Sequence, residues 1–500
     1  MDDMKIKCLS CILVFIILFG FTANTYAQNL NNDGAPYNGY NYNEYRIVAT
    51  PNGYLPERAV SGIDCGAGRF KSPQDFFVDK NNNVYVLDSG NNRVVILDSD
   101  LKLKKIIDKF ASGSGEETLN NPTGIFVDDK GLIYIADREN GRVLVSDQDG
   151  RISEVIGKPK TDTLPESFVF KPKKVIKSST GVTYVLAENV VNGALEYDED
   201  GNFTGYFGSN PVEFSLNLFW KTVVNKFLNK KQRMQLSRNV PIEYSSLDID
   251  EKGFIYTCTD ASQKAFPTGQ IKRLNHLGKN LMKNISYDPA GPEFVNSTTT
   301  ITTNFVDIDV DKDGFLNALD SGRGKVYKYN QESSLLFVFG SNSGAGGAQL
   351  GTFKMPVAVE SMEGKVLVLD AKKNNITVFA ETEFAKKVFK AMKLYRDGLN
   401  TEALEPWREV LKANNNYELA YTGIGKALMN EGQFKEAMKY FKLGQEKEYY
   451  SDAFKEYRTQ VLREHFSLIM FLLLALIILV YLLKNLRGLK KMIFRIGRGV

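Results

Sequence analysis

The feature that most constrains the fold of this chain is an internal repeat, which occurs six times before residue 380. In each copy, short apolar segments alternate with polar turns, and an Asp commonly ends the segment. Apolar and polar residues alternate with a period of two, and Asn, Asp and Gly flank the segments, which is typical of short antiparallel strands. The copies start at Pro73, Pro122, Pro172, Ser246, Phe305 and Pro356. Six units of roughly 50 residues predict a mainly β fold, a six-bladed β-propeller over residues 55–380.

The sixth copy lacks its own fourth strand, because its third apolar segment (376–379) leads directly into helical sequence. A short segment at 57–60 (Glu-Arg-Ala-Val) precedes the first copy, at the place where the outer strand of a blade would stand. We expect this N-terminal strand to complete the sixth blade, because it would cover an otherwise open sheet edge.

Two phrases of the first copies, YVLDSGNNRVVILD and YIADRENGRVLVSD, resemble the NHL repeat. The resemblance implies that Asp88 with Arg93, and Asp137 with Arg142, form structural pairs within or between blades. The fifth and sixth copies depart from this pattern, with Lys325 and Ile376 near the position of the Arg. NHL-type propellers include enzymes, RNA-binding or peptide-binding proteins and extracellular sensors, so the fold alone does not decide the function.

From Glu383 the apolar period changes to that of a helix, and five positions recur at a spacing of 34 residues. Ala391, Leu394, Gly398, Ala403 and Trp407 recur as Gly425, Leu428, Gly432, Ala437 and Phe441. The segment resembles tetratricopeptide repeats, which predicts a small all-α helical-repeat stalk over residues 383–465. The resemblance implies a peptide groove, whose inner-helix positions fall on the partner-binding candidates Tyr395, Arg396, Lys426 and Asn430. A stalk that acts only as a spacer is the alternative, since two repeats offer little concave surface.

Both ends of the chain indicate a membrane location. Residues 1–27 read as a secretory signal peptide, and residues 28–54 as an Asn/Tyr-rich leader. Residues 466–483 are an uninterrupted apolar run, long enough for a single transmembrane helix. The basic tail 484–500 contains six Lys or Arg and no acid, which predicts a cytoplasmic C-terminus and an extracytoplasmic N-terminal domain at the cell membrane.

The propeller is predicted to contain a helical insertion at 211–243. Apolar residues recur there at helical spacing, and Lys and Arg lie off that face. Trp220 and Phe227 on the apolar face are candidates for partner binding. The insertion either packs on the propeller or contacts the membrane surface or a membrane partner, as basic amphipathic helices often do.

The composition excludes several kinds of chemistry. The chain has only two His, so a three-His metal site cannot form within one copy. No Ser/His/Asp or Cys/His grouping is present, and we predict no catalytic residue. The basic tail alone exceeds the formal net charge of +4, so the remainder is slightly acidic and no nucleic-acid partner is expected.

One acidic stretch matches the spacing of a calcium-binding loop, with candidate ligands Asp309, Asp311, Asp313 and Asp320. It occupies the hairpin position of the repeat, so we expect an ordinary hairpin and no cofactor, with calcium as the alternative.

These features together predict a non-enzymatic, membrane-anchored extracytoplasmic binding or scaffold protein. Its partner would be a membrane or extracytoplasmic protein, for example in a transport or envelope complex. The alternative is a propeller hydrolase or lactonase with an axial calcium ion. A receptor for a wall polymer or sugar is a third hypothesis, based on the Tyr-rich segment 37–45.

Overall fold

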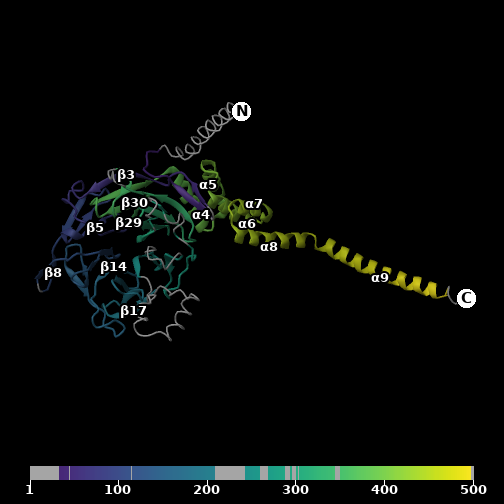
Figure 1. The fold of residues 1–500 in the computed structure, drawn as a ribbon, viewed down its shortest axis with the longest axis horizontal. Coiled ribbons are helices and arrows are strands. Elements are labelled where there is room, and N and C mark those ends of the chain that lie inside the picture. Colours follow the sequence, from purple (N-terminus) through teal and green to yellow (C-terminus); the bar gives the residue numbers. More distant parts are fainter. Residues whose placement is uncertain are drawn as a thin grey trace, which may run out of the picture. The chain divides into compact units, whose positions relative to one another are not determined.

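The computed structural model describes residues 33–43, 46–113, 115–208, 243–259, 268–285, 287, 293–294, 300–301, 303–343 and 349–496. The chain divides into two compact units, Met1–Lys386 and Lys387–Val500. The first unit is a six-bladed β-propeller and the second is helical (Figure 1). The predicted signal peptide (1–27) and nearly all of the predicted insertion (211–243), with Trp220 and Phe227, lie outside the described residues.

Each blade is an antiparallel sheet, and in blades 1 to 5 the described strands follow one another in sequence, from the innermost outward. Blade 1 consists of β4 (Asp75–Val78), β5 (Val84–Asp88), β6 (Arg93–Leu97) and β7 (Leu103–Ile107). Blade 2 consists of β10 (Gly124–Val127), β11 (Ile133–Asp137), β12 (Arg142–Ser146) and β13 (Ile152–Ile156). Blade 3 consists of β14 (Pro172–Lys177), β15 (Thr183–Ala187), β16 (Ala194–Tyr197) and β17 (Phe203–Phe207).

The other three blades follow the same plan. Blade 4 shows three strands among its described residues, β18 (Tyr244–Ile249), β19 (Ile255–Thr259) and β20 (Ile271–Leu274). Blade 5 consists of β23 (Phe305–Val310), β24 (Leu316–Asp320), β25 (Lys325–Tyr329) and β26 (Leu335–Phe339). Blade 6 consists of β29 (Pro356–Met362), β30 (Lys365–Asp370), β31 (Asn375–Glu381) and β3 (Tyr54–Ser61).

The N-terminal strand closes the ring. β3 pairs with β31 from Tyr54 opposite Glu381 to Ser61 opposite Asn375, so the first and last strands share one sheet. This pairing confirms the predicted closure, although the strand is longer than the segment 57–60. Part of the leader is also folded, because β1 (Tyr40–Asn43) and β2 (Arg46–Ala49) form a hairpin.

Short two-stranded sheets lie outside the blades. They are the antiparallel pairs β8 (Phe110–Ser112) with β9 (Gly115–Glu117) and β21 (Glu293–Phe294) with β22 (Thr300–Ile301), and the parallel pair β27 (Ser341–Asn342) with β28 (Thr352–Phe353).

The second strand of a blade is covered on both faces. Every residue of β5, β11, β19 and β24 is buried. Neighbouring blades pack on both sides of such a strand, so its sequence is apolar at nearly every position, while outer strands such as β13 alternate. The core therefore consists of the layers between blades, and the innermost strands add a polar centre on the axis.

The second unit contains helices that repeat. α4 (Glu383–Arg396) and α6 (Glu418–Asn430) end 34 residues apart, and α5 (Asn400–Ala413) and α7 (Phe434–Leu443) begin 34 residues apart. α4 begins in the first unit and ends in the second. The turns between the helices of each pair contain Gly398 and Gly432, both with positive φ. The helix bounds thus repeat with the period of the sequence, while the tetratricopeptide resemblance itself stays a prediction.

Two helices, α8 (Lys447–Glu464) and α9 (Phe466–Ile496), complete the unit. No Gly or Pro interrupts residues 451–487, yet the stretch forms two helices and not one. The break falls at His465, whose φ of −106° and ψ of 10° leave the helical region. It coincides with the change from a charged helix to an apolar one.

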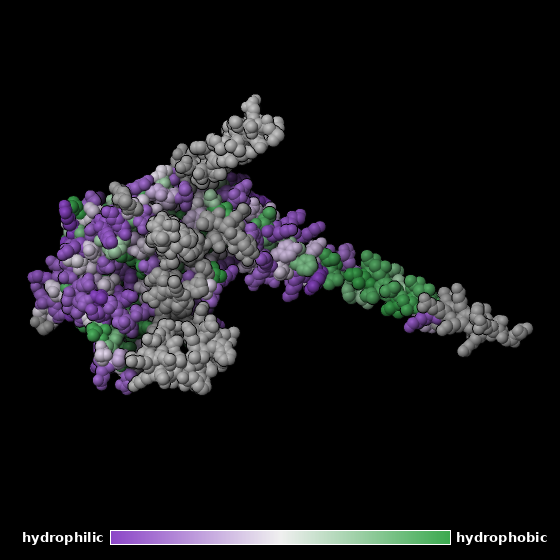
Figure 2. Space-filling view, viewed as in Figure 1, coloured by the Kyte–Doolittle hydropathy of each residue, from purple (hydrophilic) through white to green (hydrophobic). Residues whose placement is uncertain are grey.

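α9 contains one candidate membrane span, Phe466–Lys484, with a mean hydropathy of 3.1 and none of its residues buried. Figure 2 shows a continuous hydrophobic surface along this part of the helix. Its length and composition are sufficient to cross a membrane, in agreement with the span predicted over 466–483.

Candidate functional site

The innermost strands β4, β10, β14, β18, β23 and β29 form a ring, each in contact with the next. Two residues of each innermost strand form two axial layers, namely the third and the fifth counted from Pro73, Pro122, Pro172, Tyr244, Phe305 and Pro356. The first axial layer consists of Asp75, Gly124, Lys174, Ser246, Asp307 and Ala358. The second axial layer consists of Phe77, Phe126, Ile176, Asp248, Asp309 and Glu360.

The first axial layer holds one cation between two carboxylates. Lys174 Nζ lies 2.6 Å from Asp75 Oδ1 and 3.0 Å from Asp307 Oδ1. Ser246 Oγ donates a hydrogen bond of 2.6 Å to the same oxygen of Asp307. These contacts join blades 1, 3, 4 and 5, although blades 1, 3 and 5 are not neighbours, so these side chains meet at the propeller axis.

Burial and charge act in opposite directions in this layer. Burial lowers the pKa of Lys174, but the carboxylates of Asp307 and Asp75 outweigh it and raise that pKa. Burial raises the pKa of Asp75 to about 6, against the opposing effect of Lys174. Lys174 is therefore charged at all physiological pH values, and two carboxylates compete for it.

The second axial layer is divided into an apolar and an acidic half. Blades 1 to 3 contribute Phe77, Phe126 and Ile176, and the two phenyl rings pack edge to face with centroids 5.0 Å apart. Blades 4 to 6 contribute Asp248, Asp309 and Glu360. Carboxyl groups thus gather on one side of the axis, opposite an aromatic wall.

Crowding changes how these acids ionise. Burial raises the pKa of Asp309 to about 6. Burial, and next the charge of Asp309, raises the pKa of Asp248 and that of Glu360 well above the usual range. Carboxylates close to one another repel, which favours the protonated form of each group. The acidic half therefore favours protonated carboxyl groups more than an exposed cluster of acids would.

The same carboxylates also hold neighbouring blades together. In the first axial layer, Asp75 Oδ2 accepts from Ile125 N at 2.9 Å, and Asp307 Oδ2 accepts from Val359 N at 2.9 Å. In the second axial layer, Asp248 Oδ2 accepts from Val310 N at 2.7 Å, and Glu360 Oε2 accepts from Val78 N at 3.4 Å.

In each of these bonds the donor is a backbone amide of the next blade, one position further along the innermost strand than the acceptor. Four of the six junctions between blades therefore have such a bond. None of these axial residues except Asp309 was predicted from the sequence. The signal existed in the third and fifth positions of the aligned repeats, where polar residues interrupt otherwise apolar strands.

The predicted Asp–Arg pairs are present within single blades. Arg93 Nε lies 2.8 Å from Asp88 Oδ2, and Arg142 Nε lies 2.9 Å from Asp137 Oδ2. Asp88 Oδ1 also accepts a hydrogen bond from Lys71 N at 2.7 Å, which holds the segment before β4 against the end of β5. The pairs are structural, as the resemblance implied.

Blade 5 departs from the pattern in a different way than predicted. The partner of Asp320 is Arg323, which lies two residues before Lys325, and Arg323 Nη1 is 3.3 Å from Asp320 Oδ2. Both side chains are fully buried. The fifth repeat therefore keeps its pair, since a longer side chain can reach Asp320 from the turn. In blade 6, Asp370 accepts backbone bonds from Lys354 and Met355.

The four candidate calcium ligands do not form one loop site. Asp309 lies at the axis, where Asn317 Nδ2 and Ser361 Oγ donate to it at 2.7 and 2.6 Å. Asp311 and Asp313 lie in the hairpin before β24, while Asp320 ends that strand. Asp311 Oδ1 accepts from Phe315 N at 2.9 Å, as expected for an ordinary hairpin. Among the described residues, no group of three or more His, Cys, Asp or Glu is arranged to hold a metal ion.

The partner-binding candidates of the helical unit fall into two groups. Lys426 Nζ donates to Tyr395 Oη at 2.8 Å and lies 4.4 Å from the centre of that ring. It also lies 4.2 Å from the ring of Tyr449 on α8, which was not predicted. Arg396 and Asn430 are exposed at the ends of α4 and α6. The structure therefore brings Tyr395 and Lys426 into contact, and Tyr449 contacts Lys426 as a third member of this cluster.

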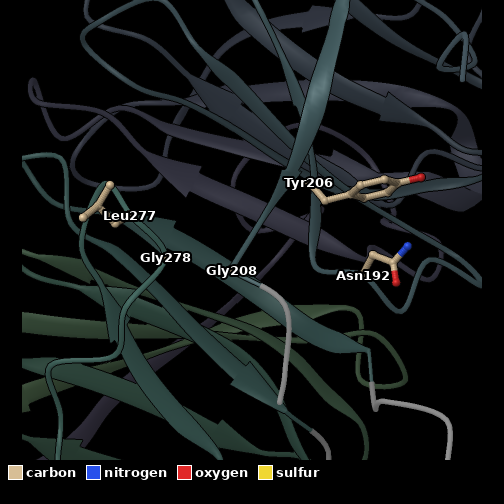
Figure 3. A pocket seen from close by; sticks show the side chains of 5 residues that line it. All are labelled: Asn192, Tyr206, Gly208, Leu277 and Gly278. Carbon is tan, nitrogen blue, oxygen red and sulfur yellow. The ribbon is translucent and has the colours of Figure 1, made fainter. Parts of the chain in front are cut away.

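A cavity of about 420 Å³ lies at the outer end of blade 3. It is lined by Asn192, Tyr206, Gly208, Leu277 and Gly278. Figure 3 shows Asn192 and Tyr206 on one side and the loop with Leu277 on the other. The hydroxyl groups of Tyr206 and Thr163 are 2.6 Å apart. The described residues that line the cavity carry no charge, and they offer an amide, a phenol and an apolar side chain.

The fold is thus that of a six-bladed β-propeller followed by helices. The family model of the NHL repeat matches residues 70–97 and 119–145, in the first two blades. No curated protein matches the chain.

Several solved structures are similar at low identity. Virginiamycin B lyase from Staphylococcus aureus is 11% identical, with a TM-score of 0.38 over 65% of this chain and 99% of that one. The extracellular domain of a proposed hybrid two-component system from B. thetaiotaomicron is 13% identical, with a TM-score of 0.34 over 61% of this chain and 33% of that one. A proposed gluconolactonase is 12% identical, with a TM-score of 0.39 over 67% of this chain and 94% of that one.

Proposed function

We propose that this chain is a membrane-anchored extracytoplasmic scaffold that binds a protein partner close to the membrane surface. The observation that carries the proposal is the span Phe466–Lys484, which is strongly apolar and has none of its residues buried. Such a surface is stable only in lipid or against another apolar surface. α8 ends at Glu464 and only His465 separates it from this span, so the anchor keeps α8 beside the bilayer.

The cluster of Tyr395, Lys426 and Tyr449 supports a protein partner. Three different helices contribute to it, so its geometry depends on the fold of the whole unit. Lys426 is half-buried between two phenol rings, which fixes its ammonium group. A fixed cation beside aromatic rings can pair with a carboxylate while the rings pack on apolar side chains.

The axial contacts support a rigid rather than a reactive propeller. Asp75, Asp248 and Asp307 each accept a backbone bond from the next blade. These carboxylates therefore have structural partners already. The basic tail and the predicted signal peptide support an extracytoplasmic propeller and a cytoplasmic C-terminus.

The test is recovery of partners from membranes that contain the full-length chain. After cross-linking and extraction in mild detergent, mass spectrometry should find a stoichiometric protein partner. Lys426→Glu should lower its recovery, while Lys412→Glu, the same charge change on an exposed residue of α5, should not. Thermal unfolding of both variants checks the fold. Absence of a stoichiometric partner, or full recovery with a chain lacking residues 384–450, would overturn the proposal.

One observation favours a second candidate, a propeller hydrolase or lactonase with axial calcium. Asp248, Asp309 and Glu360 place carboxylate oxygens, the ligands that calcium prefers, on one side of the axis. The opposite aromatic wall of Phe77 and Phe126 would contact an apolar substrate. The described structure does not arrange these three acids to hold a metal ion, so this candidate requires their carboxylates to converge when calcium binds.

Metal analysis of the purified chain, calcium-dependent thermal stabilisation and lactone hydrolysis test this candidate together. Glu360→Gln should abolish the calcium response, and Asp311→Ala, in the neighbouring hairpin, should leave it intact. A chain that neither contains calcium nor gains stability from it would exclude this second function.

A further inference from the structure

α8 carries an apolar stripe that the helical unit leaves open. The stripe consists of Tyr450, Phe454, Tyr457 and Val461. Tyr450 and Phe454 are 36% and 46% exposed, and the other two are half-buried. The adjacent face of α8 is covered, because Ala453 is fully buried and Tyr449 stacks on Phe441 with ring centres 5.6 Å apart. α8 thus has one face that belongs to the unit and one face without a covering element among the described residues.

The spacing within the stripe is that of a helix-pairing seam. Steps of four, three and four residues average close to 3.5, which keeps apolar positions on one line along a helix. The line ends at Val461, because the next position in this register is Glu464, the last residue of α8. The open face is therefore a regular seam of four large side chains.

Charges beside the seam permit contact between two identical helices. In a parallel pair, Gln460 would face the partner's His465, whereas Ala453, at the position opposite the partner's Arg458, is uncharged and buried within its own unit. The flanking position Ser451 is uncharged. No two groups of like charge would therefore meet along this contact.

The membrane anchor would align two copies. α8 ends at Glu464 and the span begins at Phe466, so copies in one membrane carry α8 on the same side and at the same height. Their seams are then parallel and in register without any further contact. Anchoring also raises the effective concentration, which matters because a seam of two heptads is shorter than the about three heptads of a self-sufficient coiled coil.

We propose that the seam of Tyr450, Phe454, Tyr457 and Val461 binds the same seam of a second copy of this chain, as a parallel α8–α8 dimer at the membrane. The inference rests on the membrane anchor of the proposed function. It goes beyond that function by giving the scaffold two propellers and two partner-binding units per assembly.

Cysteine cross-linking of the full-length chain in membranes tests the proposal directly. Cys65 and Cys258 are buried, and substitution of Cys8 and Cys11 removes the other natural thiols. Phe454→Cys and Val461→Cys place a thiol on the seam, while Asp452→Cys and Glu456→Cys place one on other exposed faces of α8. Mild oxidation should give several-fold more disulfide-linked dimer from the seam positions. Equal yields at all four positions, or cross-links from the seam to another protein, would overturn the proposal.

A second measurement tests the proposal if the cysteine variants do not fold. Phe454→Ser combined with Val461→Ser should convert the dimer to a monomer in native mass spectrometry from nanodiscs, with unchanged helix content. A wild-type chain that is monomeric there contradicts the proposal. Carbonate extraction separates the two hypotheses: a chain released from membranes refutes the anchor, whereas an anchored monomer refutes only the dimer.

Discussion

The ammonium group of Lys174 lies 2.6 Å from Asp75 Oδ1, and this ion pair joins blades 3 and 1 across the propeller axis. The side chain of Lys174 is 15% exposed and that of Asp75 is 2% exposed, so solvent screens the pair only weakly. Neighbouring blades already pack on each other through apolar layers. Lys174 adds a contact between blades that are not neighbours, which resists opening of the ring.

Lys174→Met should lower the free energy of unfolding by about 3–5 kcal/mol, because it leaves the buried carboxylates of Asp75 and Asp307 without their cation. Lys173→Met is the matched control, because Lys173 is one-third exposed and its ammonium group is as far as 4.0 Å from the Glu243 carboxylate, which makes a weak ion pair. Its cost should be about 1 kcal/mol or less. Denaturant unfolding followed by near-ultraviolet circular dichroism measures both. Equal costs would show that the axial pair is not a structural element.

The axial acids should make the propeller less stable as the pH rises. The pKa values of Asp75 and Asp309 are raised to about 6, above the value of about 4 in an unfolded chain. Their contribution is fully present below pH 4 and is lost as the pH rises through about 6. Asp248 and Glu360, whose pKa values are raised well above the usual range, extend the loss to higher pH.

Unfolding temperatures between pH 5 and pH 8 should therefore fall with rising pH. The free energy of unfolding should fall by up to about 1.4 kcal/mol per pH unit for each titrating group. Asp248→Asn combined with Glu360→Gln should flatten the decline, since the amides still accept the backbone bonds but cannot ionise. Asp100→Asn, on an exposed turn, serves as control. A slope that the double variant leaves unchanged would contradict the assignment of the decline to Asp248 and Glu360.

The blades could be predicted because their physics is local. Alternation and turn residues specify each hairpin, and counting strands showed that the segment 57–60 was needed to complete blade 6. The two helix pairs could be located for the same reason, since the 34-residue spacing of Gly398 and Gly432 marks equivalent turns.

The axial site could not be predicted in the same way, because it depends on contacts between blades. Lys174 and Asp307 are 133 residues apart and meet only after the ring closes. The partner of Asp320 was also missed, since the position in the repeat indicated Lys325 and not the longer Arg323 in the preceding turn. The helix break at His465 could not be predicted either, because no Gly or Pro lies near it in the sequence.

Arg323→Met should cost about 3–5 kcal/mol of unfolding free energy, because the buried carboxylate of Asp320 loses its paired cation. Lys325→Met should cost about 1 kcal/mol or less, because Lys325 lies over the ring of Tyr40 and not on Asp320. Thermal unfolding of the two variants compares the positions directly. A larger loss for Lys325→Met would restore the repeat-based assignment.

Gly423 on α6 lies where a side chain would overlap the indole of Trp407 on α5. Ala normally stabilises a helix interior over Gly by about 0.5–1 kcal/mol. Here the added methyl group must displace a ring that is 1% exposed, and overpacking of that kind costs about 1–3 kcal/mol. Gly423→Ala should therefore destabilise the helical unit. In a Trp407→Leu background the smaller side chain leaves room, so the same substitution should become neutral or stabilising. A double-mutant cycle of unfolding free energies isolates this coupling.

Stabilisation by Gly423→Ala in the native background would show that α5 and α6 do not approach closely at Gly423.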